Sequence, residues 1–200
     1  MRAGGPGSET DLPSLFQIDH RDEISNYLFM RGITIRSSEA APAFWRTVER
    51  ASELEIEPSV ATLGYPPHLT LVRYDDVDQK RLEEALHAFH GVRAFSLKFH
   101  HMRIFKGDVS VLWLAPCPDS RLLEVHAKVQ AMVGDDRCDP HYCEGTWLPH
   151  CTLAASIPRS RQTEAEALAN EPIEPIEITF DEAEALEWPP IRSIRRQRLD

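Results

Sequence analysis

Two periodicities divide the chain into strands and helices. Alternating polarity, which is typical of β-strands, occurs over Gly32–Arg36 and Phe95–Phe99. Apolar residues at three- and four-residue spacing follow Ser38, Asp76 and Asp119, three side chains that can cap a helix. The pattern therefore predicts both kinds of element along most of the chain.

The predicted elements alternate along the chain. We expect strands over 32–36, 68–74, 95–105, 109–114, 147–157, 174–180, 183–188 and 191–199, and helices over 39–53, 77–90, 119–133 and 161–170. Mixed strands and helices in this order favour an α+β fold with helices packed outside curved sheets. The basic stretch at 191–199 is interpreted as an edge strand or tail rather than a binding arm.

One five-residue pattern occurs twice. Pro67–Leu71 reads PHLTL and Pro149–Leu153 reads PHCTL, so four of five positions agree. Side chains alternate between the faces of a strand, so each histidine shares a face with its threonine and the apolar residues share the other. The copies lie about half a domain apart. We expect duplicated β-sheets in two lobes, related by a pseudo-two-fold axis, with the copies facing each other across a central cleft.

Length and composition limit the domain organisation. The chain has 200 residues, of which 42% are hydrophobic, enough for one core. We expect a single two-lobed domain over residues 16–200 and a tail without fixed structure over residues 1–15, which are rich in glycine and polar side chains. A net charge of −10 argues against binding of bulk double-stranded nucleic acid, but leaves a nucleotide or an RNA terminus as a partner.

The cysteines and the termini bear on the cellular setting. Four cysteines suggest no disulfide framework. No signal peptide or membrane-spanning stretch is evident, so a monomeric cytoplasmic protein is expected. Cys138, His141 and Cys143 have a spacing that is unusual for zinc, and no second paired element follows. We therefore expect no metal site and no cofactor.

The chain resembles the two-histidine (2H) phosphoesterase superfamily, which includes 2′-5′ RNA ligases and cyclic nucleotide phosphodiesterases. The family motif is a pair of His-x-Thr/Ser-x elements with apolar flanks, found here at His68–Leu71 and His150–Leu153. The segments Phe105–Leu114 and Trp147–Pro149 are also similar to the family, and the resemblance runs from about Gly32 to Leu186.

The resemblance implies a metal-independent phosphoesterase. Its substrate would be a 2′,3′-cyclic phosphate or a 2′-5′ phosphodiester of RNA or a nucleotide. The residues support this chemistry, because histidine titrates near pH 6.5 and one imidazole can accept a proton while the other donates one. His68 and His150 would be the general acid and base, in either order. Thr70 and Thr152 would donate hydrogen bonds to the phosphate oxygens.

Further contacts and other functions stay open. Tyr65, Phe105 and Trp147 can stack on the substrate, or can simply pack in the core. Arg73 and Arg103 can approach a second phosphate, or can be solvated surface residues. The main alternative is a non-catalytic regulatory module that binds an AMP-type nucleotide, although the complete set of two histidines and two threonines favours an enzyme. A two-histidine metalloenzyme, by contrast, would lose activity with chelators.

Overall fold

The computed structural model describes residues 30–134 and 137–200, and the tail expected over residues 1–15 lies outside them. Its strands are β1 (Met30–Arg36), β2 (His68–Tyr74), β3 (Phe95–Phe105), β4 (Val109–Pro116), β5 (Cys151–Pro158), β6 (Ile176–Phe180), β7 (Glu182–Trp188) and β8 (Arg192–Arg198). Its helices are α1 (Pro42–Ser52), α2 (Val60–Leu63), α3 (Gln79–Ala85), α4 (Ser120–Val133) and α5 (Gln162–Ala169), with 3-10 turns η1 (Leu86–Phe89), η2 (Pro140–Tyr142) and η3 (Arg159–Arg161).

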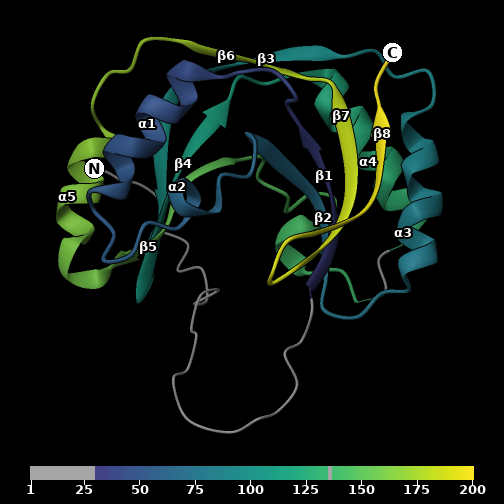
Figure 1. The fold of residues 1–200 in the computed structure, drawn as a ribbon, viewed down its shortest axis with the longest axis horizontal. Helices are drawn as coiled ribbons and strands as arrows, with labels where there is room; N and C mark the ends of the chain where they lie inside the picture. The colour runs from purple at the N-terminus through teal and green to yellow at the C-terminus, as the bar shows by residue number, and fades with distance from the viewer. Residues whose placement is uncertain (1–29, 135–136) are drawn as a thin grey trace, which may run out of the picture.

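The strands form two antiparallel sheets of the same size (Figure 1). The first sheet has the order β2-β1-β7-β8 and the second has the order β5-β4-β3-β6. The motif strands β2 and β5 each form one edge of a sheet, so the sheets correspond strand by strand. The expected duplicated, two-lobed α+β fold is confirmed. The basic C-terminal stretch is the other edge strand of the first sheet, β8, as expected.

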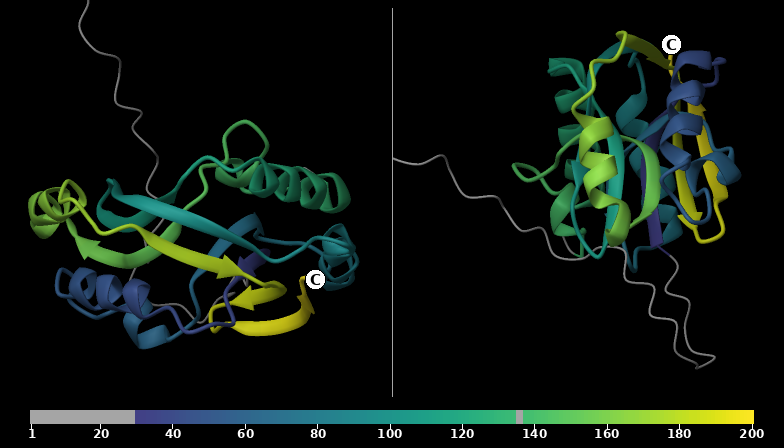
Figure 2. Two further views of the ribbon diagram at one scale, coloured as in Figure 1. Left: turned by 90° about the horizontal axis from the view of Figure 1, so that it is seen from above. Right: turned by 90° about the vertical axis from the view of Figure 1, so that its left-hand side faces the viewer.

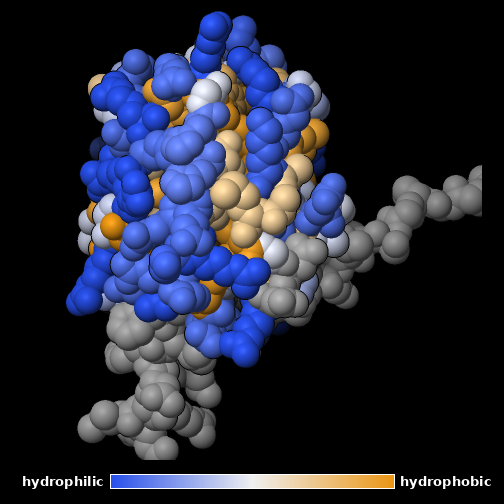
Figure 3. All heavy atoms as spheres, turned by 90° about the vertical axis from the view of Figure 1, so that its right-hand side faces the viewer, coloured by the Kyte–Doolittle hydropathy of each residue, from blue (hydrophilic) through white to orange (hydrophobic). Residues whose placement is uncertain are grey.

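Helices cover the two sheets from opposite sides of the molecule. Helices α1, α2 and α5 contact strands of the second sheet, whereas α3 and α4 contact strands of the first. Figures 1 and 2 show these two groups at opposite ends of the long axis. Phe44, Val48 and Ala51 are the buried stripe of α1, at the spacing that an amphipathic helix requires. The side of the molecule formed by α3 and α4 is mostly hydrophilic, with a small apolar area in its middle (Figure 3).

Two helices begin later than expected because their polar flanks have other partners. Helix α1 starts at Pro42, since Ser38 hydrogen-bonds to the Asp181 carboxylate through both its backbone N–H and its hydroxyl. Helix α3 is capped by Asp78, whose carboxylate accepts from the Lys80 N–H at 2.9 Å. Asp76, the expected cap, pairs with Arg137 instead.

The remaining differences concern short segments. Strand β5 begins at Cys151, so residues 147–149 precede the strand instead of belonging to it. The polar loop expected over 134–146 contains η2, and the short helix α2 was not predicted. No helix among residues 30–134 and 137–200 is both long enough and apolar enough to cross a bilayer.

Candidate active site

Both motif histidines are held in the same way. The Nδ1–H of His68 donates to the Pro66 carbonyl at 2.9 Å, and the Nδ1–H of His150 donates to the Leu148 carbonyl at 2.8 Å. A carbonyl oxygen only accepts, so each bond places a ring proton on Nδ1. In the neutral imidazole this leaves Nε2 unprotonated and able to accept a proton. The two copies of the motif therefore present the same nitrogen for chemistry.

The alternation of the motif strands is as expected. Leu69, Leu71, Cys151 and Leu153 are fully buried. The histidine and threonine of each copy are only partly buried. The core therefore holds one face of each motif strand, and the polar pair lies on the other.

Two contacts join the first motif strand to the second motif and to the segment before it. The indole N–H of Trp147 donates to the Thr70 carbonyl at 3.0 Å. The backbone N–H of His68 interacts with the thiol of Cys151, whose pKa burial raises to about 12. The structure thus brings His68, Thr70 and the His150-Cys151-Thr152 segment together from opposite ends of the sequence.

Burial shifts both imidazoles toward the neutral form. It lowers the pKa of His68 to about 4, against the opposing effect of the Pro66 hydrogen bond, and repulsion from a charged His150 lowers it further. Burial also lowers the pKa of His150, again opposed by its carbonyl hydrogen bond. Repulsion of this kind makes the titration of His68 depend on the charge of His150.

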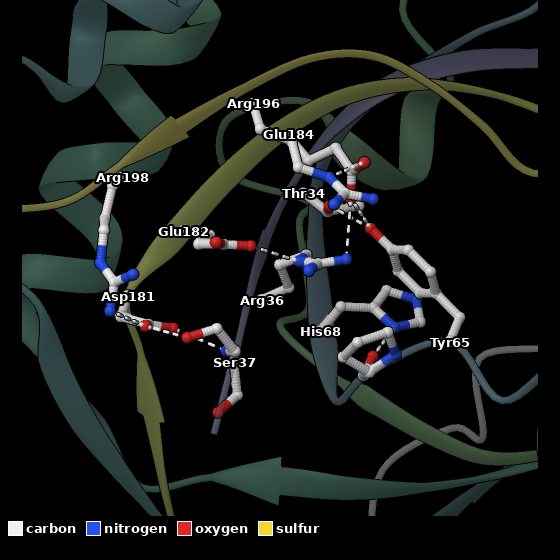
Figure 4. Close-up of polar contacts among 12 residues, drawn as sticks. Thr34, Arg36, Ser37, Tyr65, His68, Asp181, Glu182, Glu184, Arg196 and Arg198 are labelled. Carbon is white, nitrogen blue, oxygen red and sulfur yellow. Dashed lines mark hydrogen bonds and ion pairs between the residues drawn. The ribbon is translucent and has the colours of Figure 1, made fainter. Parts of the chain in front are cut away.

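The two histidines differ in their surroundings. His68 lies beside Tyr65, with the ring centroids 4.8 Å apart in an edge-to-face arrangement. The Tyr65 hydroxyl donates to the Glu184 carboxylate at 2.5 Å, and Figure 4 shows the tyrosine between His68 and that carboxylate. The Arg36 guanidinium lies over the Tyr65 ring and pairs with Glu184 at 3.4 Å.

Glu184 is the centre of this polar group. Its side chain is fully buried and also accepts from Arg196 Nε at 2.7 Å. Burial alone would raise the pKa of Glu184, but hydrogen bonds from Ser193, Tyr65 and Arg196 lower it below its usual value. Glu184 is therefore a buried carboxylate with its charge compensated.

His150, in contrast, lies among aromatic rings. Phe105 and Trp113 stack on each other at 4.7 Å, and both present their rings edge to face to His150, at 5.3 and 5.8 Å. Tyr142 lies at 6.3 Å. The two copies of the motif have nearly the same sequence, but His68 lies beside a charged network and His150 lies among aromatic rings.

The three rings considered for substrate stacking have different positions. Tyr65 is buried, and its hydroxyl is engaged with Glu184 and with Thr34 at 3.3 Å. Trp147 stacks on His126 with centroids 4.0 Å apart and rings nearly parallel. Phe105 is partly exposed and lies against His150. Of the three, Phe105 is placed best to meet a ligand held by the histidine.

Sequence reasoning did not identify Arg36, Glu184 or Trp113 as neighbours of the histidines. In β7, Glu184 stands between two alanines, a pattern that reads as a solvent-facing position. Its burial depends on strand pairing, because β1 places Thr34 opposite Glu184 and β8 places Arg196 there. No local pattern carries that information.

The cysteines near the second motif have other contacts. His141 Nδ1 bonds to the Asp139 carboxylate at 2.9 Å, and the thiols of Cys138 and Cys143 both point to the Asp139 carbonyl. Among the described residues, no three His, Cys, Asp or Glu side chains are grouped so that they could hold a metal ion.

Comparisons with known proteins bear on the family and the fold. The family model described as the 2′-5′ RNA ligase superfamily matches residues 40–189. A search of curated proteins gives no match. The crystal structure of a phosphoesterase is similar, with a TM-score of 0.56 and 17% identity, over 84% of this chain and 97% of that chain. E. coli LigT in complex with 3′-AMP is similar with a TM-score of 0.52 and 15% identity, over 84% of this chain and 98% of LigT. At these identities the likeness establishes a shared fold, while the family model spans most of the chain. The chain belongs to the 2′-5′ RNA ligase superfamily.

Proposed function

We propose that the protein is a metal-independent phosphoesterase that acts on a 2′,3′-cyclic phosphate or a 2′-5′ phosphodiester of RNA or a nucleotide. The observation that carries this proposal is the matched anchoring of two imidazoles through Nδ1, one in β2 and one immediately before β5. Family membership and the fold shared with LigT and a phosphoesterase support it.

The two histidines divide the proton transfers. One neutral imidazole takes a proton from the attacking water through Nε2. The other, protonated on both nitrogens, donates from Nε2 to the departing ribose oxygen. Both imidazoles favour the neutral form in the free protein. A bound phosphate anion would favour protonation, because an opposite charge nearby stabilises the imidazolium. Substrate binding thereby raises the pKa of the imidazole that acts as the general acid, so that it is protonated when the ribose oxygen departs.

The threonines and one aromatic ring complete the proposed site. Thr70 and Thr152 each lie two residues after a histidine, on the same face of the strand, and their hydroxyls donate to the non-bridging oxygens as charge develops there. Phe105, which is partly exposed beside His150, provides a surface for a base or ribose. The nucleotide in the LigT complex, 3′-AMP, has a phosphate on a ribose hydroxyl, as a product of the proposed hydrolysis would.

A substrate screen tests the proposal. The purified protein is incubated with RNA ending in a 2′,3′-cyclic phosphate, a 2′-5′-linked oligonucleotide, a cyclic mononucleotide and ADP-ribose 1″,2″-cyclic phosphate, and 2′- and 3′-phosphate products are separated. We expect turnover of at least one substrate, undiminished by EDTA. If calorimetry shows tight nucleotide binding but no substrate is turned over, the protein is a nucleotide-binding module and not an enzyme. Loss of activity with EDTA would contradict the metal-independent mechanism.

A further inference from the structure

Three strands of the second sheet place Thr152, Trp113 and Arg103 in one cross-strand row. Trp113 lies opposite Thr152 on the neighbouring strand, and Arg103 lies opposite Trp113 on the next. Residues directly opposite each other in antiparallel strands share a face of the sheet. The Trp113 ring meets His150 on that face. Arg103 therefore shares a face with the second motif, about 10 Å away, two strand spacings, from Thr152.

Arg103 is a cation without a counterion in the part of the chain that the structure describes. Its side chain is exposed, and among the described residues no hydrogen bond or ion pair engages it. The other arginine considered for a second phosphate, Arg73, is engaged, because its Nε lies 3.6 Å from the Asp139 carboxylate and its guanidinium also bonds to Tyr142. Of the two, only Arg103 keeps its charge and donors available for a ligand.

The corresponding row of the first sheet has the opposite character. It runs from Thr70 to Thr34 to Glu184, so a buried carboxylate holds the position that Arg103 holds in the second sheet. The next residue of that row, Arg196, is bound to this carboxylate. The row on the second sheet therefore offers an anionic substrate an uncompensated cation, Arg103. The row on the first sheet offers none, because its arginine is bound to Glu184.

We propose that Arg103 binds a second phosphate of the substrate, next to the phosphate held between the histidines. This inference rests on the proposed function and narrows it to substrates with a second phosphate, such as the end of an oligoribonucleotide, because a cyclic mononucleotide has only one. The stacked rings of Phe105 and Trp113 lie on the same face as Arg103, with Phe105 two residues along the same strand. The partly exposed ring of Phe105, backed by the buried ring of Trp113, provides a platform for the nucleoside between the two phosphates. A guanidinium suits this role because it donates two parallel hydrogen bonds to phosphate.

Binding measurements test this role independently of turnover. Calorimetric titrations compare 3′-AMP with the dinucleotide ApA 3′-phosphate, which has one additional phosphodiester, in the wild type, Arg103→Gln and Arg93→Gln. Arg93 is an exposed arginine in the loop before β3, so its substitution removes the same charge away from the site. We expect the wild type to prefer the dinucleotide and Arg103→Gln to weaken dinucleotide binding by about 10- to 100-fold. Binding of 3′-AMP should be unchanged in both variants.

Three results would overturn the inference. The first is equal affinity of the wild type for both ligands. The second is that Arg103→Gln weakens the binding of 3′-AMP as much as the binding of the dinucleotide. The third is that Arg93→Gln weakens dinucleotide binding as much as Arg103→Gln does, which would indicate an effect of overall charge. A protein that binds the dinucleotide through Arg103 without hydrolysing cyclic phosphates would instead disprove the proposed catalysis and leave the Arg103 contact standing.

Discussion

The indole nitrogen of Trp147 donates a hydrogen bond to the carbonyl oxygen of Thr70 at 3.0 Å. This bond attaches the segment before the second motif to the strand that carries the first. The Trp147 ring also stacks on His126, whose imidazole bonds to the Tyr142 carbonyl at 2.9 Å. The relative position of the two histidines thus depends on a side chain outside both motifs.

Trp147→Phe keeps an aromatic ring on His126 and removes the N–H donor. We expect a loss of about 1 kcal/mol in the free energy of unfolding, the usual net value of one hydrogen bond. Turnover should fall by about tenfold, because small displacements of reacting groups cost up to about 100-fold. Urea denaturation and steady-state kinetics measure the two effects. Trp45→Phe, on the distant helix α1, is the control, and equal kinetic losses in both variants would contradict the account.

Glu184→Gln removes the charge at the centre of the network beside His68. Tyr65, Arg36 and Arg196 all bond to this fully buried carboxylate, so the variant weakens three contacts and leaves the buried Arg36 guanidinium undercompensated. We expect a loss of about 3 kcal/mol in the free energy of unfolding. Glu187→Gln, a partly exposed ion-pair residue on the same strand, should cost less than about 1 kcal/mol. Equal losses in urea denaturation would show that Glu184 is not a structural centre.

The lowered pKa of His68 makes a prediction for stability. The unfolded chain binds a proton at this histidine near pH 6.5, but the folded protein does so only near pH 4. Stability should therefore fall as the pH drops from 6.5 toward 4, and His68→Gln should reduce that fall. Chemical denaturation at pH 7 and pH 4.5 measures the difference. His87→Gln, on the exposed side of η1, should show the wild-type dependence, and an identical dependence in all three proteins would refute the prediction.

The rate should also depend on pH in a defined direction. The pH dependence of kcat/KM reports the free enzyme, in which burial lowers the pKa of both histidines. We expect a bell-shaped profile with its maximum below pH 6.5, since the acid must be protonated and the base neutral. The profile of kcat should lie at higher pH, because bound phosphate stabilises the imidazolium. A kcat/KM maximum above pH 7 is the contrary outcome.

Much of the fold could be predicted from local pattern. The alternation around the motifs correctly places Leu69, Leu71, Cys151 and Leu153 in the core. The order of strands in the sheets could not be predicted, because β7 pairs with β1 and β6 pairs with β3 across long stretches of sequence. The starts of α1 and α3 were misjudged for a related reason, since Ser38 and Asp76 have partners distant in sequence.

The candidate site shows the same division. The repeated pentad identifies His68, Thr70, His150 and Thr152, because each copy is a local pattern. The difference between the copies is not local. Strand pairing brings Arg36 and Glu184 to one histidine, and brings Trp113 and Phe105 to the other. The structure thereby breaks a symmetry that the sequence alone left intact.

The most direct test of the account is the turnover of a 2′,3′-cyclic phosphate by His68→Asn and His150→Asn. The asparagine amide can donate to the carbonyl that now accepts from Nδ1, so each variant should stay folded, as thermal denaturation can verify. The account predicts that kcat falls by about 10²- to 10⁴-fold in each variant, because each removes one proton-transfer group. Wild-type turnover in either folded variant would contradict paired acid–base catalysis by the two histidines.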